Sequence, residues 1–212
     1  MSTILLTGFE PFDGQPVNAS WEAVQHVEAV WDGDARLVTR LLPVSFGSVP
    51  ALLRAAVDEV RPDVVVCVGE AGGRGRVGIE RFALNLVDAR IPDSDGAQPV
   101  DVPVVAGGPL ALESTLPVKA CFAAVRELGL PVEVSTTAGT YVCNATSYVL
   151  AHLLASTTGM RGGFVHVPRT PAQVEVGEPA LSTADSARAL GRILTVTLGT
   201  RVDARVAAGS EA

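Results

Sequence analysis

The 212-residue chain is poor in lysine, cysteine and aromatic residues, and it contains no long apolar run. Lys119 is its only lysine, its arginines are scattered, and its net charge is −7. It therefore has no basic stripe that could neutralise a nucleic-acid backbone. No segment approaches the roughly 18 uninterrupted apolar residues of a membrane-spanning helix. We expect neither a nucleic-acid partner nor a membrane partner.

The three cysteines, at positions 67, 121 and 143, cannot form a closed set of disulfides. No Cys or His spacing suits a zinc site, so we expect no metal. The opening M-S-T-I-L-L-T-G lacks the basic segment that precedes the apolar part of a signal peptide. Unpaired cysteines and this opening are typical of the reducing cytoplasm, where we expect this chain to work.

Apolar residues make up 48% and charged residues 18% of the chain, as in folded globular proteins. We expect residues 1–212 to form one well-cored domain whose tail frays from about residue 201. Apolar runs predict strands at 4–6, 35–44, 64–68, 79–87, 132–136 and 163–167. Helical periodicity predicts helices from about residue 20 and at 48–60, 118–128, 143–155 and 183–198, the last capped by Ser182 or Thr183.

Strands that alternate with helices predict an α/β sheet with helices on both faces. In such sheets, ligands lie beyond the carboxyl ends of the strands. Residues 7–14, 69–78 and 138–141 and His166 lie near such ends, so we expect them to converge on one side of the domain. Residues 88–116 form a long connection rich in Pro and Gly, which is unusual in a compact domain and makes them a candidate gate.

Residues 73–78 read G-R-G-R-V-G and match the G-x-G-x-x-G fingerprint of dinucleotide-binding proteins. That fingerprint requires its glycines to open a helix whose N-terminus holds the pyrophosphate. Here the segment starts five residues beyond the apolar strand, and the following I-E-R-F-A-L-N-L-V alternates like another strand. We therefore expect a mobile or closely approached loop in place of a nucleotide site.

Cys143 lies at a transition from loop to helix, in A-G-T-Y-V-C-N-A-T, whereas Cys67 and Cys121 lie inside apolar segments. The first amides and the dipole of a helix favour a thiolate, which is the form that attacks carbonyl carbons. Unpaired cysteines are also among the most frequently buried residues, so Cys143 is either a nucleophile or a small core residue. We expect Cys67 and Cys121 to be buried and inert.

A cysteine nucleophile needs a base, and the chain has three histidines. We place His26 near the polar face of the first helix, and His152 lies about half a revolution round the helix from Cys143. His166, at the end of G-F-V-H-V-P, is the remaining candidate, and a satisfied histidine at a strand end is the alternative. Glu80 is the candidate acid at the edge of an apolar strand, and a solvated surface glutamate is its alternative.

Four segments together resemble the type I pyroglutamyl peptidases, cysteine peptidases that are also called pyrrolidone-carboxylate peptidases. The segments are L-L-T-G-F-E-P-F-D-G; G-E-A-G-G-R with the later I-E-R-F-A-L-N-L-V-D-A-R-I-P-D-S-D-G; T-A-G-T-Y-V-C-N; and G-F-V-H-V-P. Their order and spacing match over about residues 3–198. The resemblance implies a catalytic triad of Cys143, His166 and Glu80, and an exopeptidase that removes an N-terminal pyroglutamyl (5-oxoprolyl) residue from peptides.

The resemblance also implies substrate-binding residues outside this triad. Phe9 and Phe12 match an aromatic pair that holds the pyroglutamyl ring, although a local packing cluster is the alternative for them. Asn18 matches a polar contact near the ring, and Arg90 lies close to the active centre. Glu70 stands where bacterial members often carry Gln, so either backbone groups bind the lactam there or the affinity for the ring suffers.

The fold that the resemblance implies is a three-layer α/β/α sandwich with a twisted, mostly parallel mixed sheet. It further implies that the protein needs no metal or cofactor and forms a homo-oligomer, with a tetramer as the expected state. Three other functions stay open: a glutaminase or related amidohydrolase, a pyroglutamate-binding module without activity, and an oxidoreductase that binds a nucleotide at residues 73–78.

Overall fold

A six-stranded mixed sheet forms the centre of the protein, in a computed structural model that describes residues 1–209. Its strand order is β2-β1-β3-β8-β4-β7, and every neighbouring pair is parallel except β4 and β8. The strands are β1 (Thr3–Phe9), β2 (Arg36–Leu42), β3 (Val64–Ala71), β4 (Val77–Glu80), β7 (Val132–Ser135) and β8 (Arg161–Pro168). Among the described residues, no helix combines the length and apolarity needed to cross a membrane.

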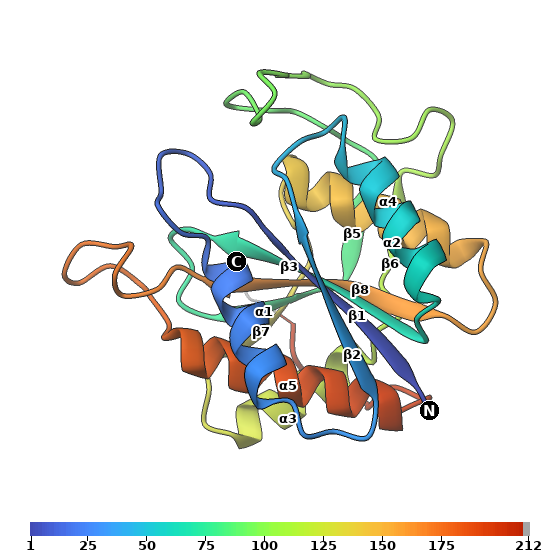
Figure 1. The fold of residues 1–212 in the computed structure, drawn as a ribbon, viewed down its shortest axis with the longest axis vertical. Coiled ribbons are helices and arrows are strands. Elements are labelled where there is room, and N and C mark those ends of the chain that lie inside the picture. Colours follow the sequence, from blue (N-terminus) through green and yellow to red (C-terminus); the bar gives the residue numbers. More distant parts are fainter. Residues whose placement is uncertain (210–212) are drawn as a thin grey trace.

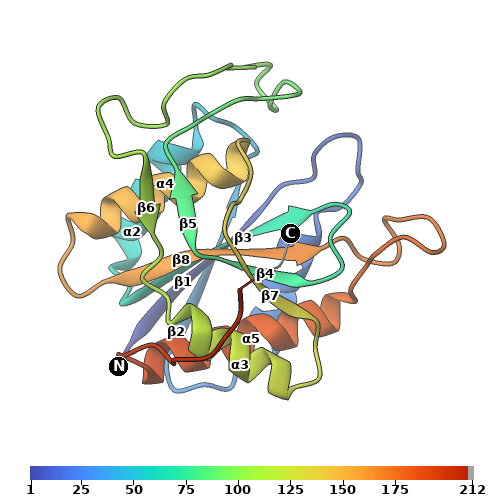
Figure 2. The ribbon, with the colours of Figure 1, turned by 180° about the vertical axis from the view of Figure 1, so that it is seen from behind.

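Five helices cover the two faces of this sheet (Figure 1). One face carries α1 (Ala19–Val30), α3 (Val118–Glu127) and α5 (Thr183–Gly199), and the other carries α2 (Val49–Val60) and α4 (Val142–Ala155). Figure 2 shows the same two helical layers from behind. Three layers and a mostly parallel mixed sheet confirm the predicted fold class, and Ser182 caps α5 by accepting from the Asp185 amide.

The apolar run V-V-V-C-V of β3 is explained by this layering. Val64, Val66 and Val68 pack into the core beneath α1, α3 and α5, whereas Val65 and Cys67 pack into the core beneath α2 and α4. A strand that is covered on both faces must be apolar at every position, because successive side chains point to opposite faces. The same alternation decides which polar residues at the strand ends can meet.

The single strand predicted at 79–87 is wrong, since the chain divides it between two sheets. Glu80 ends β4 in the main sheet, and β5 (Phe82–Leu84) pairs with β6 (Ala111–Glu113) in a separate antiparallel ribbon. The ribbon packs against α4, where Ala83 is buried. An alternating pattern gives the face of each residue but not the sheet that it joins. The connection 88–116 therefore contains a strand that we did not expect.

The segment after Arg201, where we expected fraying, forms no helix or strand through Gly209. Asp203 within it is nevertheless fastened to the body of the protein. Its carboxylate accepts hydrogen bonds from the Lys119 and Ala120 amides over 3.0 and 2.8 Å. These amides open α3, whose own N-cap position is Pro117 and offers no side-chain acceptor. Asp203 therefore caps a helix that lies more than eighty residues earlier in the chain.

Candidate active site

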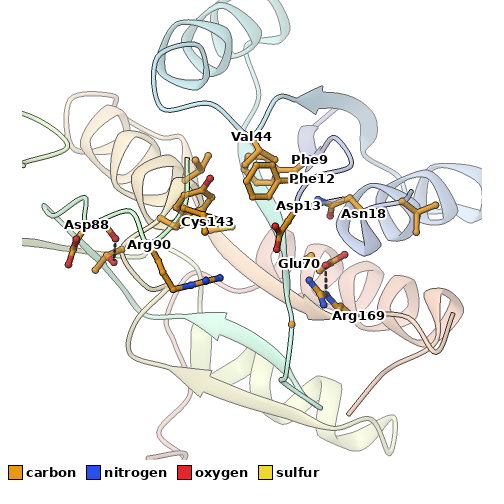
Figure 3. Close-up of a pocket in the computed structure, with 16 residues that line it drawn as sticks. Phe9, Phe12, Asp13, Asn18, Val44, Glu70, Asp88, Arg90, Cys143 and Arg169 are labelled. Atoms are coloured by element: carbon orange, nitrogen blue, oxygen red, sulfur yellow. Dashed lines mark hydrogen bonds and ion pairs between the residues drawn. The ribbon is translucent and has the colours of Figure 1, made fainter. Parts of the chain in front are cut away.

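A cavity of about 350 Å³ opens beyond the carboxyl ends of β1 and β3 (Figure 3). Six of the eight predicted site residues line it: Phe9, Phe12, Asn18, Glu70, Arg90 and Cys143. Its position follows the rule that ligands of open α/β sheets bind beyond the carboxyl ends of the strands. The other two, Glu80 and His166, lie on the neighbouring strands β4 and β8. The sequence segments that we expected to converge therefore do so.

Cys143 is the second residue of α4, after a turn in which Gly139 has a φ of 81°. L side chains rarely adopt that φ, so glycine allows the chain to turn into the helix there. The sulfur lies over Gly69 at the end of β3, and a Cβ added to Gly69 would come within 2.8 Å of Sγ. The missing side chain at position 69 is what makes room for the thiol.

Burial raises the pKa of the Cys143 thiol to about 12, and the nearby charges of Glu80 and Glu70 act in the same direction. We expected the start of a helix to favour the thiolate. Desolvation outweighs the helix dipole here because the half-buried Cys143 places its sulfur between α4 and the sheet, against Gly69. With its pKa raised in this way, Cys143 needs a base that takes its proton during any attack.

Glu80 and His166 form a buried hydrogen-bonded pair, with Nδ1 of the imidazole 2.7 Å from Oε1 of the carboxylate. Their exposed fractions are 1% and 4%. Gly78 pairs with His166 across the antiparallel β4–β8 ladder. Because Ile79 packs into the α1–α5 core, Glu80 points to the face that α4 covers, and so does His166, since Val165 and Val167 occupy the opposite face.

The three triad candidates thus gather at one corner of the α4 face. Gly69, which lies beneath the Cys143 sulfur, is the register partner of His166 on the adjacent strand. Among the described residues, no hydrogen bond joins the thiol to the imidazole. Hydrogen bonds of catalytic groups are often long in a site without ligand and tighten when substrate binds. The carboxylate fixes the imidazole with Nδ1 as the donor, which leaves Nε2 free to accept a proton.

The two phenylalanines differ in burial. Phe9 is 2% exposed and packs on Phe164 with ring centroids 6.4 Å apart. Phe12 is half-buried and packs on Tyr141 at 5.7 Å. Both line the cavity, so these two residues are at once a local packing cluster and part of the cavity wall. Packing against the core holds a flat apolar wall in place.

The polar side-chain atoms of Asn18 and Glu70 form hydrogen bonds with other groups of the protein. Asn18 is the N-cap of α1, where its Oδ1 accepts from the Ser20 amide and its Nδ2 donates to the Glu10 carbonyl. Glu70 accepts from Arg169 Nε, from the Ala19 amide and from Gln173 Nε2 over 2.7–2.8 Å. Glu70 therefore fastens the segment after β8 to the start of α1 and shapes one wall of the cavity.

Arg90 is exposed, and Figure 3 shows its guanidinium reaching into the space between Cys143 and Arg169. It is the third residue of the connection 88–116, whose first residues are fastened beside the cavity. Thr140 and Asp88 exchange two hydrogen bonds, and the Tyr141 hydroxyl donates to the Pro92 carbonyl. The part of the connection nearest the site is therefore anchored to the loop that precedes α4.

Within the described residues, the structure confirms the predicted burial of Cys67 and Cys121 and the absence of a helix directly after the glycine-rich segment. Cys67 and Cys121 are fully buried, and burial raises the pKa of Cys67 to about 12 and that of Cys121 to about 11. The glycine-rich segment 73–78 runs into β4 and not into a helix, as its context predicted. Within residues 1–209, no group of three or more His, Cys, Asp or Glu side chains is placed to hold a metal ion.

Two residues of this site escaped the sequence reasoning. Arg74, inside the glycine-rich segment, donates to Glu80 Oε1 over 3.0 Å. Asn144, next to Cys143, is fully buried and bonds the backbone of β5. An Asn on the buried side of a helix was a visible signal. For Arg74 there was none, because its contact depends on how the loop folds back over β4.

Comparison with known proteins relates nearly the whole chain to one family. The family model of pyroglutamyl peptidase matches residues 2–198. The pyrrolidone-carboxylate peptidases of Clavibacter michiganensis and Klebsiella pneumoniae are 52% and 47% identical to this chain. Each alignment covers 99% of this chain and 99% of the relative. Solved structures of pyroglutamyl peptidase I from Bacillus amyloliquefaciens and of pyrrolidone carboxyl peptidase from Thermococcus litoralis superpose on this chain with TM-scores of 0.94 and 0.92. They are 39% and 33% identical and cover 98% of this chain and 100% of their own. The chain therefore belongs to the pyroglutamyl peptidase family.

Proposed function

We propose that this protein is a cysteine exopeptidase that removes an N-terminal pyroglutamyl residue from peptides. Cys143 is the nucleophile, His166 the acid and base, and Glu80 the carboxylate that orients His166. The observation that carries this proposal is the buried 2.7 Å hydrogen bond between Glu80 and His166 beside the Cys143 sulfur, at the edge of the cavity. A buried His–carboxylate pair next to a thiol is the arrangement that nucleophilic acyl transfer requires.

The cavity suits a substrate end that carries no charge. A pyroglutamyl residue is a lactam and has no ammonium group, so a site that reads it needs no carboxylate free for an ion pair. Glu70 agrees with this, because its carboxylate is already bound by Arg169, Gln173 and the Ala19 amide. Asp13 and Asp88 also line the cavity, and its apolar lining includes Phe9 and Phe12, against which a flat ring can pack.

The reaction proceeds in two acyl-transfer steps. His166 takes the thiol proton as Cys143 Sγ attacks the pyroglutamyl carbonyl carbon, and the S–C bond forms. His166 then gives that proton to the departing amine as the C–N bond breaks, which leaves a thioester. Water, deprotonated by His166, attacks the thioester, and the S–C bond breaks to release pyroglutamate and restore the thiol.

Negative charge develops on the carbonyl oxygen in both steps. The free amides at the start of α4 and the Arg90 guanidinium are the donors proposed for this oxygen. Loss of one such donor typically lowers kcat by about 100-fold or more. The amide donors act without reorganisation, because the start of α4 is already fixed by its packing.

The test is hydrolysis of a pyroglutamyl fluorogenic amide by the wild type, Cys143→Ala and Cys121→Ala. We expect the first substitution to abolish hydrolysis and the second to retain it, since Cys121 lies beneath α5 on the far face of the sheet. Hydrolysis by Cys143→Ala would refute the proposal. Release of ammonia from glutamine in place of pyroglutamyl hydrolysis would indicate a glutaminase, and pyroglutamate binding without turnover would indicate a binding module.

We further infer that the protein works in the cytoplasm as a homo-oligomer, with a tetramer as the expected state. Support for association comes from the connection 88–116, on which Val100 and Leu110 are 58% and 89% exposed. Val102, two residues after Val100, is also exposed (41%), and contiguous exposed apolar patches are typical of surfaces that another chain covers. Light scattering coupled to gel filtration measures the mass in solution, and a monomer at micromolar concentration would contradict the inference.

A further inference from the structure

Arg74 shares with His166 a single oxygen of the buried Glu80 carboxylate. Its Nη1 donates to Glu80 Oε1 over 3.0 Å, and the same atom lies 2.7 Å from His166 Nδ1. The second oxygen, Oε2, is buried and has no hydrogen-bond partner among the described residues. Arg74, which is positively charged, and His166, which can become so, therefore compete for the same oxygen of Glu80, Oε1.

The guanidinium of Arg74 is held in this position from two sides. Its Nη2 donates to the Thr137 carbonyl over 3.2 Å, in the loop that leads to α4. Its Nη1 also packs on Gly78, where an added Cβ would lie 3.1 Å away. Gly78 is the register partner of His166. Arg74 thus links the loop after β3 to the segment before Cys143 across the Glu80–His166 pair.

Charged groups from four elements meet around Cys143. Glu80 on β4 and Glu70 on β3 raise the pKa of its thiol, and Arg74 on the intervening loop lowers it. His166 on β8 contacts Glu80 directly. Glu70 is already paired with Arg169, so its charge is compensated within its own cluster. Arg74 is the cation that pairs with Glu80, whose side chain is fully buried.

We propose that Arg74 is a positioning residue that neutralises Glu80 on the oxygen used by His166 and thereby lets Cys143 lose its proton at a lower pH. The proposal rests on the proposed function, because it concerns the same triad. An unpaired carboxylate in this buried site would oppose a thiolate nearby. It would also bind the imidazolium proton more tightly, because hydrogen bonds between two charged groups are the stronger kind. Sharing Oε1 with Arg74 weakens both effects.

Three variants isolate this role. Arg74→Gln removes the charge, Arg74→Lys keeps it, and Arg76→Gln removes a matched charge from an exposed position on the same loop. The first measurement is the pH dependence of kcat/KM on a pyroglutamyl amide. The second is the rate at which iodoacetamide alkylates Cys143 at pH 8, followed by mass spectrometry, which requires no turnover. Circular dichroism confirms that each variant is folded.

For Arg74→Gln we expect the acid limb of the kcat/KM profile to move up by about one pH unit. We also expect the alkylation rate at pH 8 to fall by about tenfold. Both are the size of effect expected when one opposite charge near a titrating group is lost. Arg74→Lys should recover most of both, and Arg76→Gln should match the wild type. A merely structural loss would lower kcat/KM at every pH alike and would leave the limb where it is.

An acid limb and an alkylation rate that are unchanged in folded Arg74→Gln would overturn the proposal, and so would equal changes in Arg76→Gln. If Arg74→Gln does not fold, the Lys variant decides, because a profile like the wild type supports a charge-dependent role and a displaced one contradicts it. Failure of the proposed function is distinguishable, since the wild type would then not hydrolyse the amide at any pH.

Discussion

The Asn144 side chain forms hydrogen bonds with both the amide and the carbonyl group of Leu84. The Leu84 amide donates to Oδ1 and Nδ2 donates to the Leu84 carbonyl, each over 2.9 Å, and Nδ2 also donates to the Leu86 carbonyl over 2.9 Å. The side chain is fully buried. One amide therefore ties the start of α4, and with it Cys143, to the strand that begins two residues after Glu80.

Replacing Asn144 by Ala should damage both stability and turnover. The change leaves one amide and two carbonyls without partners in a buried place, so we expect the free energy of unfolding to fall by about 2–4 kcal/mol. We also expect kcat to fall, because the thiol loses its fixed distance from the Glu80–His166 pair. Urea unfolding and steady-state kinetics measure the two effects. Asn85→Ala is the matched control, since the Asn85 side chain bonds Val105 and Gly108 of the connection and not the segment that leads from Glu80. An equal loss of kcat there would contradict the positioning role.

Gly69→Ala should block the site without unfolding the protein. An added Cβ would lie 2.8 Å from the Cys143 sulfur and 2.8 Å from Phe164, closer than real contacts allow. The sulfur must move, and a shift of about 1 Å at a reacting atom can cost roughly 100-fold in rate. The control is Gly191→Ala, on α5 with open space around it, which should keep full activity. If Gly69→Ala kept the kcat of the wild type, the position of the Cys143 sulfur over residue 69 would not be required for catalysis.

The pKa of Cys143 predicts how its alkylation depends on pH. Because burial and two carboxylates raise that pKa to about 12, the thiolate fraction at neutral pH is small and increases with each pH unit. We expect the rate to rise by about tenfold per unit between pH 7 and pH 10, without a plateau. A free thiol in solution serves as control and levels off above its ordinary pKa. A plateau below pH 7 would mean that the resting enzyme holds a thiolate.

Asp203→Ala should lower stability and leave activity unchanged. The carboxylate caps α3, which has no other side-chain cap, and loss of a cap typically costs about 1 kcal/mol. For a chain of this size, that corresponds to a fall in Tm of about 2–4 °C. Asp203→Asn keeps an acceptor oxygen and should recover part of the loss. Asp203 contacts the start of α3, which covers the opposite face of the sheet from α4, so kcat/KM should match the wild type. An unchanged Tm would show that the cap contributes nothing.

Several features of the fold were readable from local patterns alone. The run V-V-V-C-V predicts a strand that is covered on both faces, and β3 is one. Ser182 and Thr183 before an amphipathic stretch predict a side-chain cap for α5, and Ser182 provides it. Both succeed because burial on one face or both, and the unpaired amides of a helix, constrain neighbouring residues directly. By contrast, alternation in 79–87 left open which sheet each half joins, since that choice depends on partners far along the chain.

For the site, the sequence predicted the chemistry-bearing residues through the motifs of the family resemblance, with Cys143, His166 and Glu80 each in its own matching segment. It left open whether Glu80 was a solvated surface group and whether Cys143 was a core residue. Only the tertiary structure decided that Glu80 and His166 are paired and buried, that the thiol pKa is raised, and that Arg74 shares the carboxylate. The reason is physical: pairing, desolvation and charge compensation depend on groups that the fold brings together from distant segments, 86 residues apart for Glu80 and His166.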